Sequence, residues 1–374
     1  MRRRPVRDGL RPALVLSLCL AVGVLVTAGC SSSGGGSGAT PNPDTTTALT
    51  SARHFLHTYV AADGRVVRHD QGGDTVSEGQ GYALLLAVAT HDARTFRTVW
   101  TWTQQNLQQQ SGLFAYHWQD GEVSSATPAS DADVQIAWAL DLGARTFGVP
   151  SWRAAATRIG KAVANAEIGY DDNGKPVLAA GPWAVGSGAA STVAPGYWTP
   201  PATAALAQLT GDRRLAGLGA SEPQHFSALT HDGTSLPPDW ATLGGGDAGT
   251  AIPAPNQTGA GQFGPDAMRA LVWNSCAPTT RPLVGKLWHL LAPSADRAPL
   301  ARGLDGTPQQ SSRAPLSAVA AAAAALAAGH ASEAHHLLAL AQQIDASYPT
   351  YYGAAWVALG RVLLTTQRLA NCAS

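Results

Sequence analysis

Three stretches of the sequence place a carboxylate where an apolar helical pattern begins. They are SEGQGYALLLAV with Glu78, ASDADVQIAWAL with Asp131 and Asp133, and GQFGPDAMRALVW with Asp266. Carboxyl groups in different environments can divide the work of general acid and general base catalysis. The three stretches therefore make acid–base chemistry by paired carboxyl groups a candidate function.

Each of these carboxylates also has a purely structural interpretation. Ser77 followed by Gln80 is typical of a capping box, with Ser77 as N-cap and Glu78 at the first helical position, where the helix dipole favours a negative charge. The second stretch offers two aspartates, one of which suits an N-cap. Asp266 has Arg269 one turn further on, which is typical of a local ion pair.

Aromatic side chains are the second feature with chemical meaning. The chain contains 11 Trp, and flat aromatic faces can stack on the apolar faces of sugar rings. Four tryptophans near expected helix ends or in loops are candidates for lining a carbohydrate cleft: Trp118, Trp183, Trp198 and Trp240. Core packing is the alternative, and it is favoured for those inside expected helices: Trp100, Trp138 and Trp356.

Helical periodicity dominates the elements that must position these residues. We expect about twelve helices, mostly in pairs joined by short turns. Their ranges are 45–61, 78–91, 92–107, 131–146, 151–166, 200–209, 212–229, 266–274, 279–292, 313–328, 331–345 and 353–366. Such a set suits an α-solenoid or a closed toroid of helical hairpins, and the lack of a repeated motif at a fixed period favours the toroid. The active site would then lie where the inner helices begin.

Two segments depart from the helical pattern. Residues 175–185, KPVLAAGPWAV, are the best candidate for a β-hairpin. Residues 230–263 are rich in Gly and Pro and long for a connection, which indicates a functional loop.

The N-terminal segment is expected to direct export. Residues 1–29 combine five arginines with a short apolar run and small residues before Cys30, as a signal peptide does. The ending VTAGC resembles the bacterial lipobox, which predicts that Cys30 is lipidated and anchors the chain to a membrane. Ordinary cleavage near Ala28, followed by secretion, is the alternative. Residues 30–44 predict a flexible tether and 45–370 a single folded domain.

Charge and cysteine content exclude several classes of protein. The chain has 25 basic and 25 acidic residues, and removal of 1–29 leaves 20 and 24, a net charge of −4 without a basic run. Nucleic acid is therefore not an expected partner. Histidines and cysteines do not show the spacing of a metal site, so we predict no metal and no cofactor. Cys276 and Cys372 are left as a pair in an exported chain, and a disulfide and two free thiols are both open.

Taken together and in order, SEGQGYALLLAV, ASDADVQIAWAL, GTSLPPDW and FGPDAMR resemble glycoside hydrolase family 8, over about residues 45–365. The resemblance implies an all-α fold, an (α/α)6 barrel, as a single catalytic domain. It also implies inverting hydrolysis of β-1,4-glucans and related polymers.

The resemblance also assigns roles to individual residues. Glu78 corresponds to the general acid, Asp131 to the aspartate that grips the sugar at subsite −1, and Asp266 to the general base of the cellulase-like subfamily. Tyr197, in APGYWTPP, corresponds to a tyrosine near the attacking water, and Arg269 to the arginine beside the base.

Two departures from the family pattern surround these residues. Pro265 stands where the family usually has Tyr, and Gly196 replaces a serine. The proline is comfortable at the first helical position, but it removes an aromatic ring beside the base. The acid role also meets opposition, because a helix N-terminus stabilises ionised Glu78. Burial and a nearby carboxylate, for which Asp131 is the candidate, must outweigh that effect.

The leading function is a monomeric, lipid-anchored or secreted endo-β-1,4-glucanase acting on cellulose-like β-glucan, with Trp118, Trp198 and Trp240 as substrate-binding aromatics. Trp240 would act as a stacking platform in the segment DGTSLPPDW, where Asp239 supports the loop. Rivals within the family are xylanase, lichenase and chitosanase. A non-catalytic glucan-binding or cellulose-synthesis accessory lipoprotein and a solenoid adaptor are the readings from other classes.

Overall fold

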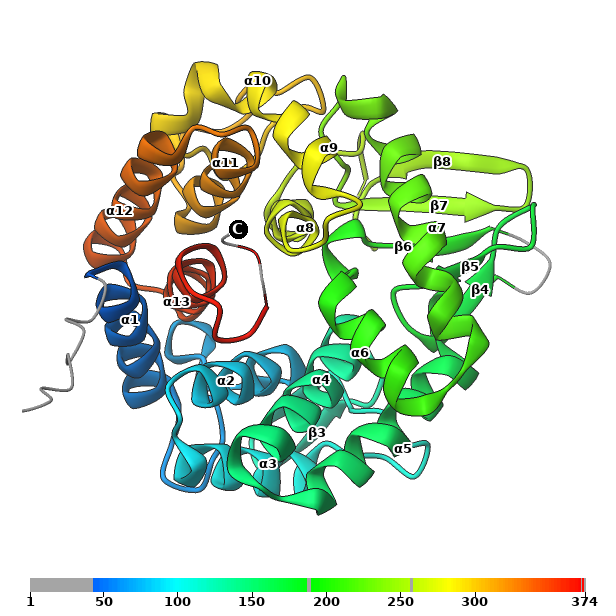
Figure 1. Cartoon of the computed structure of the whole chain (residues 1–374), viewed down its shortest axis with the longest axis vertical. Coiled ribbons are helices and arrows are strands. Elements are labelled where there is room, and N and C mark those ends of the chain that lie inside the picture. The colour runs from blue at the N-terminus through cyan, green and yellow to red at the C-terminus, as the bar shows by residue number, and fades with distance from the viewer. Residues whose placement is uncertain (1–42, 187–189, 256–257, 371, 373–374) are drawn as a thin grey trace, which may run out of the picture. The chain divides into compact units, whose positions relative to one another are not determined.

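The computed structural model describes residues 43–370 and Cys372, apart from 187–189 and 256–257 (Figure 1). The described residues belong to one compact unit, Pro41–Ser374. The predicted signal peptide, Cys30 and most of the predicted tether lie outside the described residues. The first helix begins at Pro43, so it includes the last two residues that we assigned to the tether.

The described residues form two concentric rings of helices. The inner helices are α2 (Ser77–Ala89), α4 (Ser130–Phe147), α6 (Pro200–Thr210), α8 (Pro265–Ser275), α11 (Pro315–Ala327) and α13 (Tyr351–Thr365). The outer ones are α1 (Pro43–Tyr59), α3 (Ala93–Asn106), α5 (Pro150–Ala166), α7 (Arg213–Leu229), the short α9 (Arg281–Lys286) and α10 (Trp288–Leu291), and α12 (Ala331–Ser347). Successive inner helices pack on one another, and α13 closes the ring on α2 (Figure 1). The predicted (α/α)6 barrel is confirmed, and ring closure excludes an open solenoid.

The two rings differ in composition because their surroundings differ. The inner helix α11, PLSAVAAAAAALA, is buried on almost every face, and α2 and α13 are buried in the same way. A helix that is apolar all round has to be surrounded by other elements. Outer helices such as α5 bury one stripe, which includes Trp152, Ile159 and Val163, and expose the other face. In α11 most residues are Ala or Ser, whose small side chains allow close approach of the neighbouring inner helices.

The predicted helix over 279–292 is divided in the structure. It consists of α9, α10 and a 3-10 segment, η5 (Ala292–Arg297). Pro293 follows directly after the end of α10 and its C-cap Ala292. A proline lacks the backbone donor that an α-helix needs, so the hydrogen-bond ladder cannot continue through it, and Ser294 after it departs from helical geometry.

Three small sheets lie in the connections between helices. They are β1 (Thr75–Val76), β2 (His117–Gln119) and β3 (Glu122–Ser125); β4 (Ile168–Tyr170) with β5 (Pro176–Leu178); and β6 (Ser191–Val193), β7 (Trp240–Gly244) and β8 (Asp247–Ile252). The predicted hairpin over 175–185 is only partly correct, because β5 pairs with the preceding β4 and the remainder contains a 3-10 turn, η2 (Pro182–Ala184). The expected loop over 230–263 contains the β7–β8 hairpin. Among the helices of the described residues, none is long and apolar enough to cross a membrane.

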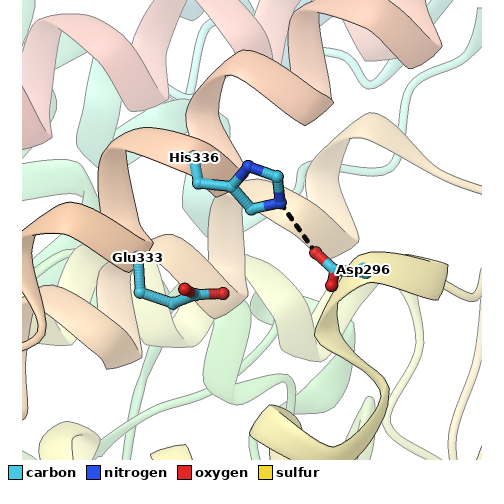
Figure 2. A group of neighbouring side chains, drawn as sticks. All are labelled: Asp296, Glu333 and His336. Carbon is cyan, nitrogen blue, oxygen red and sulfur yellow. Dashed lines mark hydrogen bonds and ion pairs between the residues drawn. The ribbon is translucent and has the colours of Figure 1, made fainter.

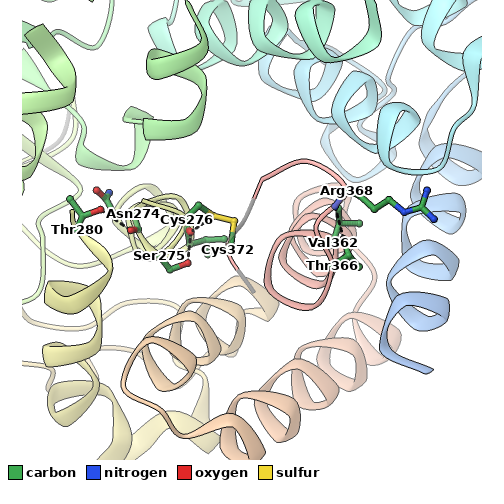
Figure 3. Close-up of a disulfide and its surroundings, with 9 residues drawn as sticks. Asn274, Ser275, Cys276, Thr280, Val362, Thr366, Arg368 and Cys372 are labelled. Atoms are coloured by element: carbon green, nitrogen blue, oxygen red, sulfur yellow. Dashed lines mark hydrogen bonds between the residues drawn. A yellow bond between two sulfur atoms is a disulfide. The ribbon is translucent and has the colours of Figure 1, made fainter. Parts of the chain in front are cut away.

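A disulfide joins the C-terminal end of α8 to the chain that follows α13. Cys276 is the C-cap residue of α8, and it is bonded to Cys372, 96 residues further along the chain (Figure 3). Of the two alternatives left open for this pair, the structure contains the disulfide. The bond therefore ties the C-terminal segment to the inner ring at the end of α8 opposite Asp266.

We expect this disulfide to stabilise the barrel without affecting chemistry. Replacing both cysteines, Cys276→Ala with Cys372→Ala, should lower the free energy of unfolding by about 2–4 kcal/mol, because the cross-link closes a long loop in the unfolded chain. Chemical denaturation with and without reductant measures the loss. Reduction should destabilise the wild type and leave the double variant unchanged, and equal sensitivity of the two proteins would contradict the prediction.

Candidate active site

The three carboxylates singled out in the sequence occupy the same position in three inner helices. Glu78, Asp131 and Asp266 are the second residues of α2, α4 and α8. The N-termini of these helices meet at one mouth of the barrel, where all three side chains line a single pocket of about 610 Å³. The carboxylates thus lie where we expected the active site, at the beginnings of the inner helices.

None of these three helices has a side-chain N-cap of its own. Val76, Ala129 and Gly264 are the N-cap residues, and none of their side chains caps the helix. The predicted capping box is wrong: the Ser77 hydroxyl has no hydrogen-bond partner among the residues that the structure describes. The buried Gln80 side chain instead accepts a hydrogen bond from the Val66 amide at 2.6 Å and donates to Thr103 Oγ1 at 2.7 Å. A tertiary partner has replaced the local one.

Asp133 has a structural role that is different from the predicted N-cap. Its side chain is fully buried, and Oδ1 accepts a hydrogen bond from the Phe114 amide at 2.8 Å. The carboxyl group also pairs with that of Glu167, which is equally buried. Burial raises the pKa of both carboxyls well above their ordinary values.

Arg269 holds the three pocket carboxylates together. Its Nη1 donates to Glu78 Oε1 at 2.6 Å and to Asp131 Oδ2 at 2.8 Å, and its Nη2 donates to Asp266 Oδ1 at 2.7 Å. The predicted local Asp266–Arg269 pair is therefore present, but it is one of three ion pairs. The guanidinium is 2% exposed. Burial alone would lower the pKa of Arg269, and the surrounding groups, including Tyr352 and Glu78, outweigh that effect and raise it.

The pocket holds more negative than positive charge among these groups. Three carboxylates share one arginine, and the Tyr82 hydroxyl also donates to Glu78 Oε1. Burial raises the pKa of Asp131 to about 7, against the attraction of Arg269 and with a further contribution from the charge of Glu78. The Asp131 carboxyl therefore keeps its proton up to near-neutral pH. It lies on the side of the pocket that also holds Glu78.

Aromatic groups hold Asp266 and Arg269 from the other side. Tyr197, in the 3-10 turn η3 (Pro195–Tyr197), places its ring 4.9 Å from Arg269 Cζ. Trp240 packs edge-on against the Tyr197 ring at 5.6 Å, and its indole Nε1 donates to Asp266 Oδ2 at 3.0 Å. Trp240 thus orients the candidate base as well as lining the pocket.

Gly196 explains one departure from the family pattern. A Cβ atom at this position would lie 1.7 Å from the carbonyl oxygen of Asp266. Only glycine allows η3 to approach the first turn of α8 so closely. The second departure, Pro265, is the first residue of α8, as we expected, and its carbonyl accepts a hydrogen bond from the Tyr352 hydroxyl at 3.3 Å.

Two further aromatic residues line the pocket, and the sequence analysis had singled out only one of them. Trp183 and Tyr116 both line it and are 48% and 40% exposed. Trp183 is one of the four tryptophans that the sequence analysis considered as lining a carbohydrate cleft, whereas Tyr116 had no distinguishing signal in the sequence. Tyr82 was also missed, although its spacing of four residues from Glu78 on a helix indicates contact. The remaining lining residues are Ser125, Thr127, Pro128, Ala129, Ala254 and Pro255.

Two predicted substrate-binding tryptophans do not line this pocket. Trp198 is fully buried, and its indole donates to the Leu178 carbonyl at 3.0 Å, so the prediction of a stacking surface there is wrong. Trp118 lies on β2, where it packs edge-on against Trp102 and under Arg65, with 4.8 Å from the guanidinium carbon to the ring centre. Both rings are used in packing against protein.

One group of potential metal ligands lies away from the pocket. Asp296, Glu333 and His336 have ligand atoms within 4.8 Å of one another on η5 and α12 (Figure 2). His336 Nε2 and Asp296 Oδ1 are 2.9 Å apart, and both side chains are largely exposed. This arrangement is that of a solvent-exposed ion pair.

The structure is a closed helical barrel in which three carboxylates gather at the N-termini of inner helices, beside aromatic rings that line the same pocket. The sequence profile of the glycosyl hydrolases family 8 matches residues 43–367, which is nearly all of the described chain. The chain belongs to this family, as the sequence motifs indicated.

Individual relatives agree with this assignment. A probable endoglucanase of Novacetimonas hansenii is 30% identical over 195 residues, which are 50% of this chain and 56% of the relative. An endo-β-1,4-glucanase of Acetobacter xylinum has a similar structure, with a TM-score of 0.70, 23% identity and coverage of 86% of this chain and 98% of the other. A β-1,3-1,4-glucanase of Paenibacillus sp. X4 matches with a TM-score of 0.75, 16% identity and coverage of 87% and 93%. At these identities the structural matches establish the fold.

The raised pKa of Asp131 predicts a pH dependence of stability. Folded Asp131 keeps its proton up to about pH 7, whereas the unfolded residue loses it near 3.8, so ionisation costs stability as the pH rises through this interval. Between pH 5 and pH 8 the wild type should therefore lose on the order of 2 kcal/mol more than Asp131→Asn.

Urea unfolding at the two pH values measures this difference. Asp120→Asn, a substitution in the exposed turn between β2 and β3, serves as the matched control and should behave as the wild type does. Equal pH dependence of Asp131→Asn and the wild type would show that Asp131 is already ionised at pH 5.

Proposed function

We propose that this domain hydrolyses internal β-1,4-glucosidic bonds of cellulose-like polysaccharide with inversion at the anomeric carbon. The observation that carries the proposal is the convergence of Glu78, Asp131 and Asp266 on Arg269 inside one pocket. Membership of family 8 and the endoglucanase names of relatives support it. The exposed rings of Trp183 and Tyr116 offer flat faces for sugar units along the pocket.

In the proposed mechanism Glu78, in its protonated form, donates a proton to the leaving glycosidic oxygen. Asp266, as a carboxylate, removes a proton from a water that attacks the anomeric carbon from the opposite face. Asp131 binds the sugar on the non-reducing side of the scissile bond. Arg269 lies between Asp266 and Glu78 and forms an ion pair with each of them. Substrate binding must rearrange this network to release the Glu78 carboxyl toward the leaving oxygen.

Two isosteric substitutions test the assignment of acid and base. With carboxymethyl cellulose as substrate and reducing ends as the signal, Glu78→Gln and Asp266→Asn should each lower kcat by about 10³-fold or more, because an amide can neither donate the proton nor accept one. Both variants should remain folded, since each amide retains an oxygen that accepts from Arg269. Wild-type activity of Asp266→Asn would mean that another residue is the base.

Stereochemistry and substrate range provide independent outcomes. Proton NMR of fresh product should show the α-anomer first if the reaction inverts, and a β-anomer would require a retaining mechanism. A preference for xylan, mixed-linkage glucan or chitosan over cellulose would reassign the enzyme to a rival specificity. Binding of a glucan with no turnover on any of these polymers would favour the accessory-protein alternative.

We also propose that the chain is exported and acts as a monomer outside the cytoplasm, anchored by lipid at Cys30. The arginine-rich and apolar residues 1–29 and the lipobox-like VTAGC support this location. The Cys276–Cys372 disulfide supports it independently, since such bonds persist in oxidising compartments.

Substitution of the anchoring residue distinguishes anchoring from secretion. Cys30→Ser should move the protein from the membrane fraction to the soluble extracytoplasmic fraction, because the thiol that would carry the lipid is absent. Mass spectrometry of the wild-type N-terminus should find a lipidated Cys30. An unmodified N-terminus produced by cleavage near Ala28 would support ordinary secretion instead.

A further inference from the structure

Asp239 lies directly beneath the first turn of α8 and does not line the pocket. The residue precedes β7, and its side chain is 5% exposed. Its Oδ1 accepts hydrogen bonds from the Gly264 amide at 3.0 Å and from the Ala267 amide at 2.7 Å. Its Oδ2 accepts from the Gln262 side-chain amide at 3.2 Å. Both carboxylate oxygens of Asp239 therefore accept hydrogen bonds from the segment that leads into and begins α8.

The two backbone amides that Asp239 binds are those that a helix start leaves without partners. Gly264 is the N-cap residue and Ala267 the third helical residue, while Pro265 between them has no N–H. In an ordinary capping box, two side chains of the same segment satisfy these two amides. Here one carboxylate from 25 residues upstream performs both tasks, in a helix whose own N-cap has no side chain.

The local backbone is shaped for this carboxylate. A Cβ atom at Gly264 would lie 2.4 Å from Asp239 Oδ2, so any larger residue would displace the carboxylate. The Asp239 amide also donates to the Gln262 carbonyl at 2.7 Å, which fixes the carboxylate-bearing backbone against the same segment. Burial, and then the charge of Asp266, raise the pKa of Asp239 to about 6, so the cap is ionised at pH 7 and above.

The next residue in the chain completes the arrangement. Trp240 donates its indole N–H to Asp266 Oδ2, while Asp239 binds the amides on both sides of Asp266 in the sequence. The pair of consecutive residues thus holds the backbone and the side chain of Asp266 at once. Arg269 lies one turn further along α8 and donates to Asp266 Oδ1, so its position also depends on the start of this helix.

We infer that Asp239 is a positioning residue. It caps α8 from outside that helix, and this cap sets the location of Asp266 and Arg269 relative to the carboxylates of α2 and α4. The inference rests on the proposed function for the role of Asp266 as base. The cap itself is a property of the fold and can be measured without turnover.

Alanine and asparagine substitutions separate positioning from general stability. Asp239→Ala removes both acceptors and should lower kcat on carboxymethyl cellulose by on the order of 100-fold with a smaller change in KM, because a small displacement of a reacting group is enough for such a loss. Asp239→Asn keeps an oxygen that can accept from both amides, and it should recover most of the lost kcat. Rates are taken per folded molecule, from the folded fraction at the assay temperature.

Asp92 provides a matched control. It is the N-cap of α3, where its carboxylate accepts from the Thr95 amide, and α3 carries no pocket residue. Asp92→Ala should lower the melting temperature as the loss of a cap does, but it should leave kcat unchanged. Wild-type kcat in folded Asp239→Ala, or an equal loss of kcat in the Asp92 control, would overturn the inference.

Hydrogen exchange tests whether Asp239 caps α8 even if Asp239→Ala is unstable or is inactive for another reason. Gly264→Ala retains the Asp239 charge but displaces the carboxylate, so it should accelerate amide exchange in residues 262–270. Asp239→Asn keeps an accepting oxygen and should leave exchange in these residues unchanged. Unchanged exchange in Gly264→Ala and Asp239→Ala would overturn the cap. If the wild type cleaves no polymer, the proposed function fails, and faster exchange in both variants still supports the cap.

Discussion

The site depends on a single buried guanidinium. Arg269 binds one carboxylate from each of three helices, and two of these partners are 138 and 191 residues away in the chain. A buried arginine without partners would be very costly, as would three buried or half-buried carboxylates without a counter-charge. The charges therefore stabilise one another only in the assembled barrel. Burial, with a contribution from the charge of Glu78 and against the attraction of Arg269, also raises the pKa of Asp131 to about 7.

The barrel brings these charges together because the inner helices run in the same direction and begin at the same mouth. Each carboxylate is the second residue of an inner helix, so the same repeated hairpin geometry delivers all three to one mouth. The partially positive helix N-termini there favour negative groups and future contacts with polar ligands. At the opposite end of α8 the Cys276–Cys372 disulfide fastens the ring, away from the groups that must rearrange.

Around Arg269 lies a layer of residues that touch one another more than they touch solvent. Gly196 permits η3 to press against the Asp266 carbonyl, Trp240 binds the Asp266 carboxylate, and Tyr197 covers the guanidinium. Together they restrict the first turn of α8 from several sides. Such restriction gives a carboxylate one orientation, and a general base is effective only when it is held within hydrogen-bond reach of its water.

The sequence alone determined the barrel class, nearly every helix and the three carboxylates, because helical periodicity and short motifs are local properties. It also indicated the Cys276–Cys372 pair. Only the tertiary structure decided which groups satisfy which buried donors. The Gln80 side chain binds Val66 and Thr103 instead of the expected helix cap. Trp198 is buried in the core, and Asp239 caps a helix whose N-cap residue lies 25 residues further along the chain. The physical reason is that a buried polar group takes whichever partner packing brings within reach, and that partner need not be near in the chain.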